Sequence, residues 1–379
     1  MAKTLTQHLD PANGPKRILS LDGGGIRGAL TLGYLKKIET ILREKENNPD
    51  LLLCDYFDLI GGTSTGSIIA AALSIGKTVD EIKDLYMTLG GKIFGEKRDW
   101  WKPWETWKFL KAGYDHKALE DNLKSIFGNI KLGGEEIKTG LCIVAKRAET
   151  NSVWTLLNHP DGKFYNSTIG KNKDILLWQA IRASSAAPTY FTPQMIDVGD
   201  GQRAAFVDGG VSMANNPALI LLMVATLKGY PFHWAMGEDK LTIVSVGTGY
   251  SVFQKHIGEI EDAWIKTWAE HVPEMLMQDA SWQNQIILQW LSNSPTAHYI
   301  DMEIETLRDD NIGDKPYIKY LRYNFPITEK ELNALKLGKN FNVEDVKSLV
   351  EMSNAGNREV LYEIGVAAAN KIIPDHFYS

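Results

Sequence analysis

The sequence predicts an α/β fold, a three-layer sandwich with a largely parallel central sheet, plus a mainly helical C-terminal extension. Three observations predict it. Short apolar runs of strand length alternate with runs at helical spacing as far as about residue 250. Glycine clusters follow the strand-like runs, where parallel sheets place their functional loops. Beyond about residue 251, long helical patterns predominate.

The expected elements follow in chain order. Residues 17–21 form the first strand, and Leu32, Leu35, Ile38 and Leu42 then fall at helical spacing. The second strand is expected at 56–60, with a turn at 61–66 and a helix at 67–74. Further strands are expected at 140–147, 153–158, 204–207 and 241–246. A strand pair around 299–305 and 318–323 and a helical run over 343–373 complete the chain.

Composition restricts the class of protein. The 379 residues are 44% hydrophobic and 23% charged, which is typical of a globular protein. A net charge of -6 without a basic block argues against binding to polymeric nucleic acid. Cys54 and Cys142 both lie in apolar runs expected to be strands, which favours buried free thiols in a reducing compartment. The N-terminal residues lack a signal-peptide pattern, so we expect a cytoplasmic protein.

Ser64 lies in the pentapeptide Gly62-Thr63-Ser64-Thr65-Gly66, a G-x-S-x-G pattern between an expected strand and an expected helix. The pattern is typical of a serine nucleophile on a sharp turn, where a Cβ at either glycine would collide with the neighbouring strand or helix. The positive end of the following helix favours negative charge developing there. An ordinary glycine-rich turn is the alternative, and only the placement between strand and helix favours the nucleophile.

A glycine loop, Asp22-Gly23-Gly24-Gly25-Ile26-Arg27-Gly28, follows the first expected strand. Consecutive glycines free several backbone amides to converge on one oxyanion. Gly23, Gly25 and Gly28 also satisfy G-x-G-x-x-G, so a dinucleotide-binding module is an alternative. That module requires an acidic residue about 20 positions on, at the end of the next strand. This sequence has Gly61 and Gly62 there.

Asp208 ends another apolar run and precedes Gly209 and Gly210. A carboxylate can take the serine proton directly when the two side chains are within hydrogen-bond reach and shielded from water. On its own, Asp208 is better explained as a turn residue or as the cap of a helix beginning near Pro217. Only the two preceding motifs favour a role in catalysis.

Together the three motifs resemble the patatin-like phospholipase family, whose hallmarks are D-G-G-G-x-R-G, G-x-S-x-G and D-G-[GA] in this order. Residues 183–191 and 245–249 also match its pattern, and the resemblance covers residues 18–250 and, more loosely, extends to 323. It implies a patatin-like fold and phospholipase A-type hydrolysis of membrane phospholipids through a Ser–Asp dyad, without histidine, metal or cofactor. By position, the nucleophile is Ser64, the base is Asp208, the oxyanion loop is Gly23, Gly24, Gly25 and Arg27, and the supporting glycines are Gly62, Gly66, Gly209 and Gly210.

The resemblance also implies a division into domains and a way in which the activity is controlled. We expect a flexible N-terminal tail at 1–14, a patatin-like catalytic domain at 15–260, and a mainly helical C-terminal region at 261–379 packed on it. The compact plan is similar to patatin-like effectors of bacterial antiphage systems, which implies a cyclic nucleotide activator, a homo-oligomer on activation and transient membrane association. The sequence itself contains no nucleotide motif.

An α/β-hydrolase esterase with a Ser-Asp-His triad remains an alternative. Its histidine would follow the acid in the chain, which leaves His233, His256, His271, His298 and His376. His233 and His256 are the first to test, and none of the eight histidines lies in the three motifs.

Two aromatic stripes bear on lipid contact. Trp100, Trp104 and Trp107 would share one helical face, which suits a lid or a membrane-interface element, with core packing as the alternative. Trp282, Ile286 and Trp290 form the second stripe, for which core packing is expected, with an acyl-chain tunnel or a dimer contact as the alternatives.

Overall fold

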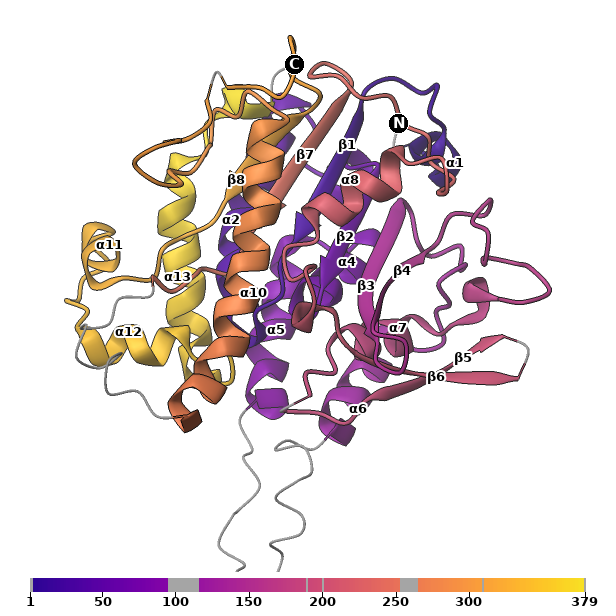
Figure 1. The fold of residues 1–379 in the computed structure, drawn as a ribbon, viewed down its shortest axis with the longest axis horizontal. Helices are drawn as coiled ribbons and strands as arrows, with labels where there is room; N and C mark the ends of the chain where they lie inside the picture. The colour runs from indigo at the N-terminus through magenta and orange to yellow at the C-terminus, as the bar shows by residue number, and fades with distance from the viewer. Residues whose placement is uncertain are drawn as a thin grey trace, which may run out of the picture.

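The computed structural model describes residues 3–94, 116–188, 190–199, 201–252, 265–308 and 310–377. Its centre is an eight-stranded sheet in the order β5-β6-β3-β2-β1-β7-β8, with β4 also paired to β3 (Figure 1). The strands are β1 (Lys16–Leu21), β2 (Leu59–Thr63), β3 (Gly140–Arg147), β4 (Ser152–Leu157), β5 (Gln194–Gly199), β6 (Gln202–Asp208), β7 (Leu241–Val246) and β8 (Lys319–Tyr323).

Most of the sheet is parallel. β1 pairs in parallel with β2 and β7, β2 with β3, and β7 with β8. The antiparallel pairs are β3 with β4, β3 with β6, and β5 with β6. The predicted α/β class with a largely parallel sheet is therefore confirmed.

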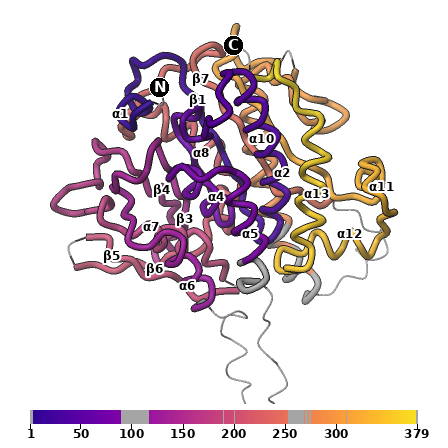
Figure 2. Tube along the Cα trace, turned by 180° about the vertical axis from the view of Figure 1, so that it is seen from behind, coloured from indigo at the N-terminus to yellow at the C-terminus, as the bar shows by residue number. Residues whose placement is uncertain are grey.

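Helices cover both faces of the sheet (Figures 1 and 2). They are α1 (Leu5–Leu9), α2 (Gly28–Lys45), α3 (Leu53–Tyr56), α4 (Thr65–Ser74), α5 (Val79–Phe94), α6 (His116–Phe127), α7 (Leu177–Ser184), α8 (Ala218–Thr226), α10 (Ile265–Trp290), α11 (Glu329–Ala334), α12 (Val343–Val350) and α13 (Arg358–Ala368). Because side chains alternate along a strand, Leu19 and Leu21 of β1 enter the core under α2, α4 and α13, whereas Ile18 enters the core under α8 and α10. In the described part of the chain, no helix has both the length and the apolar character needed to cross a bilayer.

The C-terminal part differs from expectation. The strand pair at 299–305 and 318–323 is wrong, because β8 pairs in parallel with β7 and residues 302–306 form turns in which Met302 is 91% exposed. A side chain so exposed gains nothing from the burial that holds a strand in a sheet. The helical run over 343–373 is also interrupted, by the turn between α12 and α13. This region therefore contributes a strand to the central sheet as well as helices.

The N-terminal segment contains a helix that was not expected. Within the predicted tail at 1–14 the structure places α1, whose Thr4 and Gln7 form a capping box. His8 and Leu9 are buried, and the Asp58 carboxylate accepts hydrogen bonds from Lys3 at 2.8 Å and pairs with His8 Nδ1 at 2.9 Å. These contacts fix the segment to the loop before β2.

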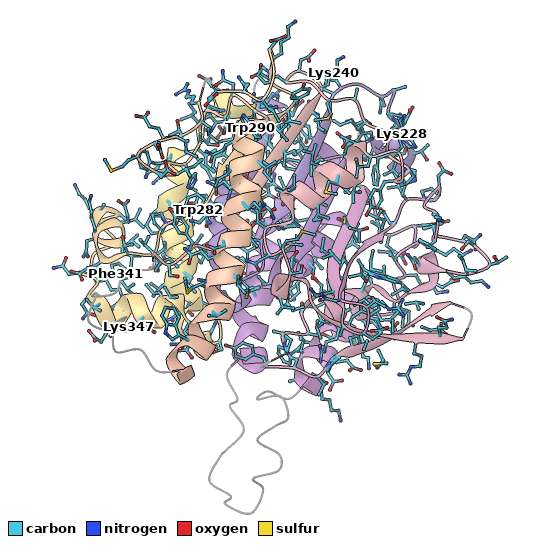
Figure 3. All side chains as sticks on the ribbon, in the orientation of Figure 1. Lys228, Lys240, Trp282, Trp290, Phe341 and Lys347 are labelled. Atoms are coloured by element: carbon cyan, nitrogen blue, oxygen red, sulfur yellow. The ribbon has the colours of Figure 1, made fainter. Side chains whose placement is uncertain are left out.

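Two smaller expectations concern single residues. Cys54 and Cys142 are buried free thiols as predicted, although Cys54 lies in helix α3 rather than in a strand. Trp282 and Trp290 both lie on α10 (Figure 3). Core packing for this second aromatic stripe is wrong, because Trp290 is 41% exposed and Trp282 is only half-buried. The first stripe, at 100–107, lies outside the described residues.

Candidate active site

Ser64 occupies the sharp turn between β2 and α4. Its φ of 54° and ψ of -125° lie in a region that residues other than glycine rarely adopt, so the backbone of the turn is strained. A Cβ on Gly62 would collide with the Gly66 carbonyl, and a Cβ on Gly66 with the Leu21 carbonyl. The two glycines of the pentapeptide therefore allow β1, β2 and α4 to approach closely enough to form the turn.

The backbone around Ser64 is held by neighbouring hydroxyl groups. The Ser64 amide donates to Ser184 Oγ at 2.9 Å, and Ser184 Oγ donates to the Val144 carbonyl at 2.6 Å. Ser67 Oγ donates to the Ser64 carbonyl at 2.6 Å. These bonds engage only the backbone of Ser64, and its side chain is half-buried. Ser184 belongs to residues 183–191, which match the family pattern in the sequence, and it supports the strained turn.

Ser64 and Asp208 come together because β2 and β6 end at adjacent positions along β3. The last residue of β2, Thr63, pairs with Val144. β6 runs the opposite way, and its last residue, Asp208, pairs with Ala145. β4 occupies the other edge of β3 over the same residues. The ends of β2 and β6 therefore meet on one edge.

The Asp208 carboxyl is buried at this meeting point. Its Oδ1 accepts a hydrogen bond from the Gly210 amide at 2.7 Å, which caps a short 3-10 turn rather than helix α8. Burial raises the pKa of Asp208 to about 6, against hydrogen bonds from the Ser64 hydroxyl and the Gly210 amide that lower it. A Cβ on Gly209 would lie 2.6 Å from the Val144 carbonyl oxygen. The glycine at 209 thus lets the loop pass close to β3.

The glycine loop lies against the nucleophile, since a Cβ on Gly23 would stand 3.2 Å from Ser64 Cβ. The Gly23 amide donates to the Asn215 carbonyl at 3.0 Å and is therefore occupied. Among the described residues, the amides of Gly24 and Gly25 donate to no protein acceptor. Two of the three predicted amides remain for an oxyanion. Arg27 is buried, and its backbone amide donates to Gly24 O at 3.2 Å.

One residue of the site was not predicted from the sequence. Arg322 of β8 forms a buried, two-point ion pair with Asp22, the first residue of the glycine loop, with Nη2 2.6 Å from Asp22 Oδ2. The pairing with Asp22 holds the pKa of Arg322 above its ordinary range. The available signal was weak, because Arg322 lies in an expected strand at 318–323 that also contains Lys319.

The histidines whose partners the structure describes contact residues other than Asp208. His8 pairs with Asp58, His376 Nδ1 is 2.9 Å from Tyr323 Oη, and His159 packs on Phe232. Burial lowers the pKa of His298 to about 4, so it is neutral at physiological pH. Two histidines were named as the first to test for the triad. His233 lies near His159, whose pKa is lowered by burial and, to a smaller extent, by His233, and His256 lies outside the described residues.

The fold and the site together define a serine hydrolase: a serine on a strained turn, a buried carboxyl beside it and a glycine loop with two available amides. A model of the patatin-like phospholipase family matches residues 19–222, more than half of the chain. The protein belongs to this family and is a lipid acyl hydrolase.

The chain is also similar to named patatins over most of its length. The chain is 27% identical over 323 residues to patatin-like protein 4 of Arabidopsis thaliana, covering 78% of this chain and 77% of that protein. It is 26% identical over 367 residues to patatin-17 of Solanum cardiophyllum, covering 92% and 82%. Among solved structures, human GIVD cytosolic phospholipase A2 aligns with 97% of this chain and 60% of its own, with a TM-score of 0.42 and 11% identity.

Proposed function

We propose that the protein hydrolyses fatty-acyl esters of membrane phospholipids as a phospholipase A, with Ser64 as nucleophile and Asp208 as base. The observation that carries the proposal is the buried Asp208 carboxyl at the point where β2 and β6 end together, close enough to Ser64 for the serine hydroxyl to lower the pKa of the carboxyl. A carboxylate with a pKa near 6 is ionised at neutral pH and basic enough to accept a proton in the transition state.

The proposed reaction has two steps. Ser64 Oγ attacks the ester carbonyl carbon and passes its proton to Asp208, while the amides of Gly24 and Gly25 bind the oxyanion. Collapse of the intermediate breaks the ester bond, and the leaving alkoxide takes the proton from Asp208. Water then attacks the acyl-enzyme and gives a proton to Asp208, which returns it to Ser64 as the fatty acid leaves.

Substitution of the two residues tests the roles. Ser64→Ala and Asp208→Asn should each lower the release of fatty acid from mixed phospholipid vesicles by about a thousandfold or more. A fluorophosphonate should label the wild type at Ser64. His233→Ala should retain full activity, and its inactivity would support the triad instead. Full activity of Asp208→Asn would overturn the dyad.

Transient membrane association is part of the proposal. Helix α10 carries an exposed apolar stripe at helical spacing, consisting of Trp268, Val272, Met275 and Leu276. The same helix contacts the loop after Asp208, because Asn284 Nδ2 donates to the Met213 carbonyl at 2.6 Å. Met213 is also exposed. Exposed apolar side chains thus occur both on the loop after Asp208 and on the helix that contacts this loop, as an interfacial surface requires.

Vesicle binding tests this surface. Leu276→Glu should weaken co-sedimentation with phosphatidylcholine vesicles by roughly tenfold, because a carboxylate replaces an inserted apolar side chain. Hydrolysis of a short soluble ester should not change. Val366→Glu, at an exposed apolar position on α13, is the matched control. Equal binding by Leu276→Glu and wild type would remove α10 from the proposal.

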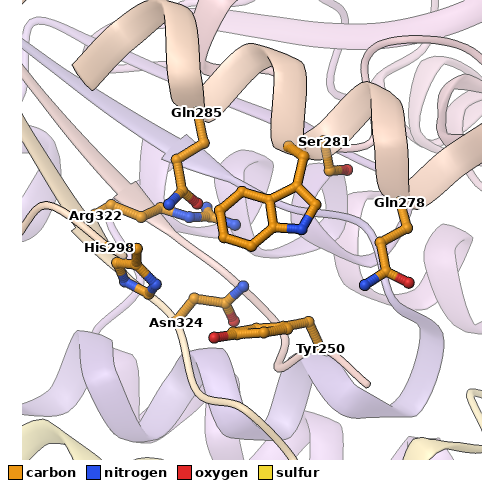
Figure 4. A pocket seen from close by; sticks show the side chains of 8 residues that line it. Tyr250, Gln278, Ser281, Gln285, His298, Arg322 and Asn324 are labelled. Carbon is orange, nitrogen blue, oxygen red and sulfur yellow. The ribbon is translucent and has the colours of Figure 1, made fainter. Parts of the chain in front are cut away.

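We also propose control by a cyclic nucleotide, with assembly of copies on activation. Support comes from a pocket between α10 and the loops after β7 and β8 (Figure 4). Its lining offers aromatic rings and amide groups, which can stack on and hydrogen-bond to a nucleobase: Tyr250, Gln278, Ser281, Trp282, Gln285, His298, Arg322 and Asn324. The Tyr250 and Trp282 rings contact each other edge to face, with centroids 6.3 Å apart and planes at 64°.

Addition of cyclic di-GMP or cyclic GMP-AMP should raise the lipase rate and the mass measured by light scattering. Gln278→Ala should weaken this response, whereas Gln283→Ala, at an exposed position on the same helix, should not. If neither nucleotide changes the rate or the mass, this part of the proposal is wrong.

A further inference from the structure

A buried ion pair stands at the start of the glycine loop. Asp22 directly follows β1, and both of its carboxylate oxygens accept hydrogen bonds from Arg322, Nη1 to Oδ1 at 2.9 Å and Nη2 to Oδ2 at 2.6 Å. Each residue is 4% exposed. Burial of two charges costs desolvation, so such a pair adds little net stability, whereas its two-point geometry fixes orientation.

The position of Arg322 in the sheet explains how it reaches the loop. Arg322 pairs with Ser245 of β7, and Ser245 pairs with Ser20 of β1, so the three residues form a row across the strands. Asp22 lies two residues beyond Ser20 and continues on the same face. Arg322 Nη1 also donates to Ser245 Oγ at 2.8 Å. The guanidinium therefore spans β7 and joins the outer strand to the end of β1.

The loop beyond Asp22 is fixed by a short series of bonds. The Asp22 amide donates to the Val246 carbonyl at 3.1 Å, and the Gly23 amide to the Asn215 carbonyl at 3.0 Å. Thr248 Oγ1 donates to the Gly23 carbonyl at 2.9 Å. In this series, Asp22 is also held through its side chain, because Arg322 donates to both of its carboxylate oxygens. The ion pair therefore fixes the residue at the start of the loop, and with it the direction in which the amides of Gly24 and Gly25 point.

We infer that the Asp22–Arg322 pair positions the glycine loop, aiming the amides of Gly24 and Gly25 at the oxyanion formed on attack by Ser64. Arg322 is thus a positioning residue for acyl transfer. This inference rests on the proposed function. Both terminal nitrogens of Arg322 donate to Asp22 or Ser245, so the guanidinium acts through the loop and not on the substrate.

Arg322→Lys tests the inference, because lysine keeps the charge but cannot make the two-point contact. We expect kcat on a soluble ester to fall roughly ten- to hundredfold with KM changed less than about threefold, as for misplaced oxyanion donors. Rates are expressed per active site, from titration with a fluorophosphonate, so that unfolded protein does not count. Arg17→Lys, near the other end of β1, is the matched control and should retain wild-type kcat.

A pH profile separates action on the loop from action on the base. Because the pair contacts the glycine loop and not Asp208, Arg322→Lys should lower the plateau of kcat/KM without moving its acidic limb near pH 6. A shifted limb, or a kcat per site above half that of wild type, would overturn the inference.

Asp22→Asn serves as the second variant if Arg322→Lys does not fold. It keeps the shape of the side chain and should lower kcat to a similar extent. In the double variant the loss should not exceed that of the stronger single variant, since both break one contact, and additive losses would contradict this. If wild type neither hydrolyses phospholipid nor is labelled at Ser64, the proposed function fails. If wild type is active and the variants match it, only the positioning inference fails.

Discussion

Asp208 is 6% exposed, and burial raises its pKa to about 6 even though the Ser64 hydroxyl and the Gly210 amide oppose the rise. As a base it must be ionised to accept the serine proton. We therefore expect kcat/KM to fall about tenfold per pH unit below about pH 6 and to be level above it. Initial rates on a soluble ester between about pH 4.5 and 8 measure this profile. An acidic limb near the ordinary aspartate value would show that the carboxyl is not the buried base.

The same burial should weaken the folded protein at neutral pH. The folded-state pKa of Asp208, about 6, exceeds the ordinary value of 3.8, so the cost of ionisation is fully present above pH 6 and is lost below about pH 4. The difference of about two pKa units corresponds to about 3 kcal/mol at most. Asp208→Asn should therefore raise the free energy of unfolding at pH 8 by about 2 to 3 kcal/mol, and not at pH 3.5. Urea unfolding at both pH values measures this, and a variant no more stable than wild type at pH 8 would contradict it.

The sequence predicted the parts of the site that lie in short motifs and missed two contacts made by residues outside them. Ser64, Asp208 and the glycine loop each stand at the end of a strand in a short pattern, so their meeting could be anticipated. Arg322 lies 300 residues from Asp22 and belongs to no motif. Only the pairing of β8 with β7 brings it to the loop. The occupied amide of Gly23 was also unpredictable, because its acceptor, the Asn215 carbonyl, depends on the folded loop.

Among the elements, strands with neighbours on both sides were easiest to predict. β3 and β7 have the expected bounds, since continuous apolar runs fit buried parallel strands. The second strand is displaced from 56–60 to 59–63, because Tyr56 ends the short helix α3. β5, at the end of the sheet, was missed because exposed and buried residues mix along it. An outer strand is defined by its partner more than by its own sequence.

Helices α2 and α13 cross with their backbones in close approach, which a single methyl group can test. A Cβ on Gly365 of α13 would collide with the backbone of Leu30 in α2. Alanine is the better helix former by about 1 kcal/mol, but the collision should cost about 1 to 3 kcal/mol more than this gain. Gly365→Ala should therefore lower the free energy of unfolding in urea. Gly229→Ala, where a Cβ meets nothing within 4 Å, is the control and should be neutral. Stabilisation by Gly365→Ala would mean that the crossing is looser than described.

At the scale of the molecule, the last third of the chain completes structures that begin in the first two thirds. β8 covers the edge of β7, α13 packs on α2, and Arg322 neutralises Asp22. The division at residue 260 therefore separates segments that share one sheet and one core. This arrangement favours folding of both segments as one cooperative unit.

A protein truncated after residue 260 should consequently not fold. Loss of Arg322 alone would leave Asp22 buried without its partner, at a cost of about 3 to 5 kcal/mol. Leu361 and Ile364 of α13 are fully buried, and removal of each would cost about 2 to 5 kcal/mol. Together these losses match or exceed the 5 to 15 kcal/mol by which domains are typically stable, so we expect no cooperative thermal transition for residues 1–260. Calorimetry and circular dichroism measure this, with the full chain as control. A cooperative transition and fluorophosphonate labelling of Ser64 in the truncated protein would show instead that residues 1–260 fold independently.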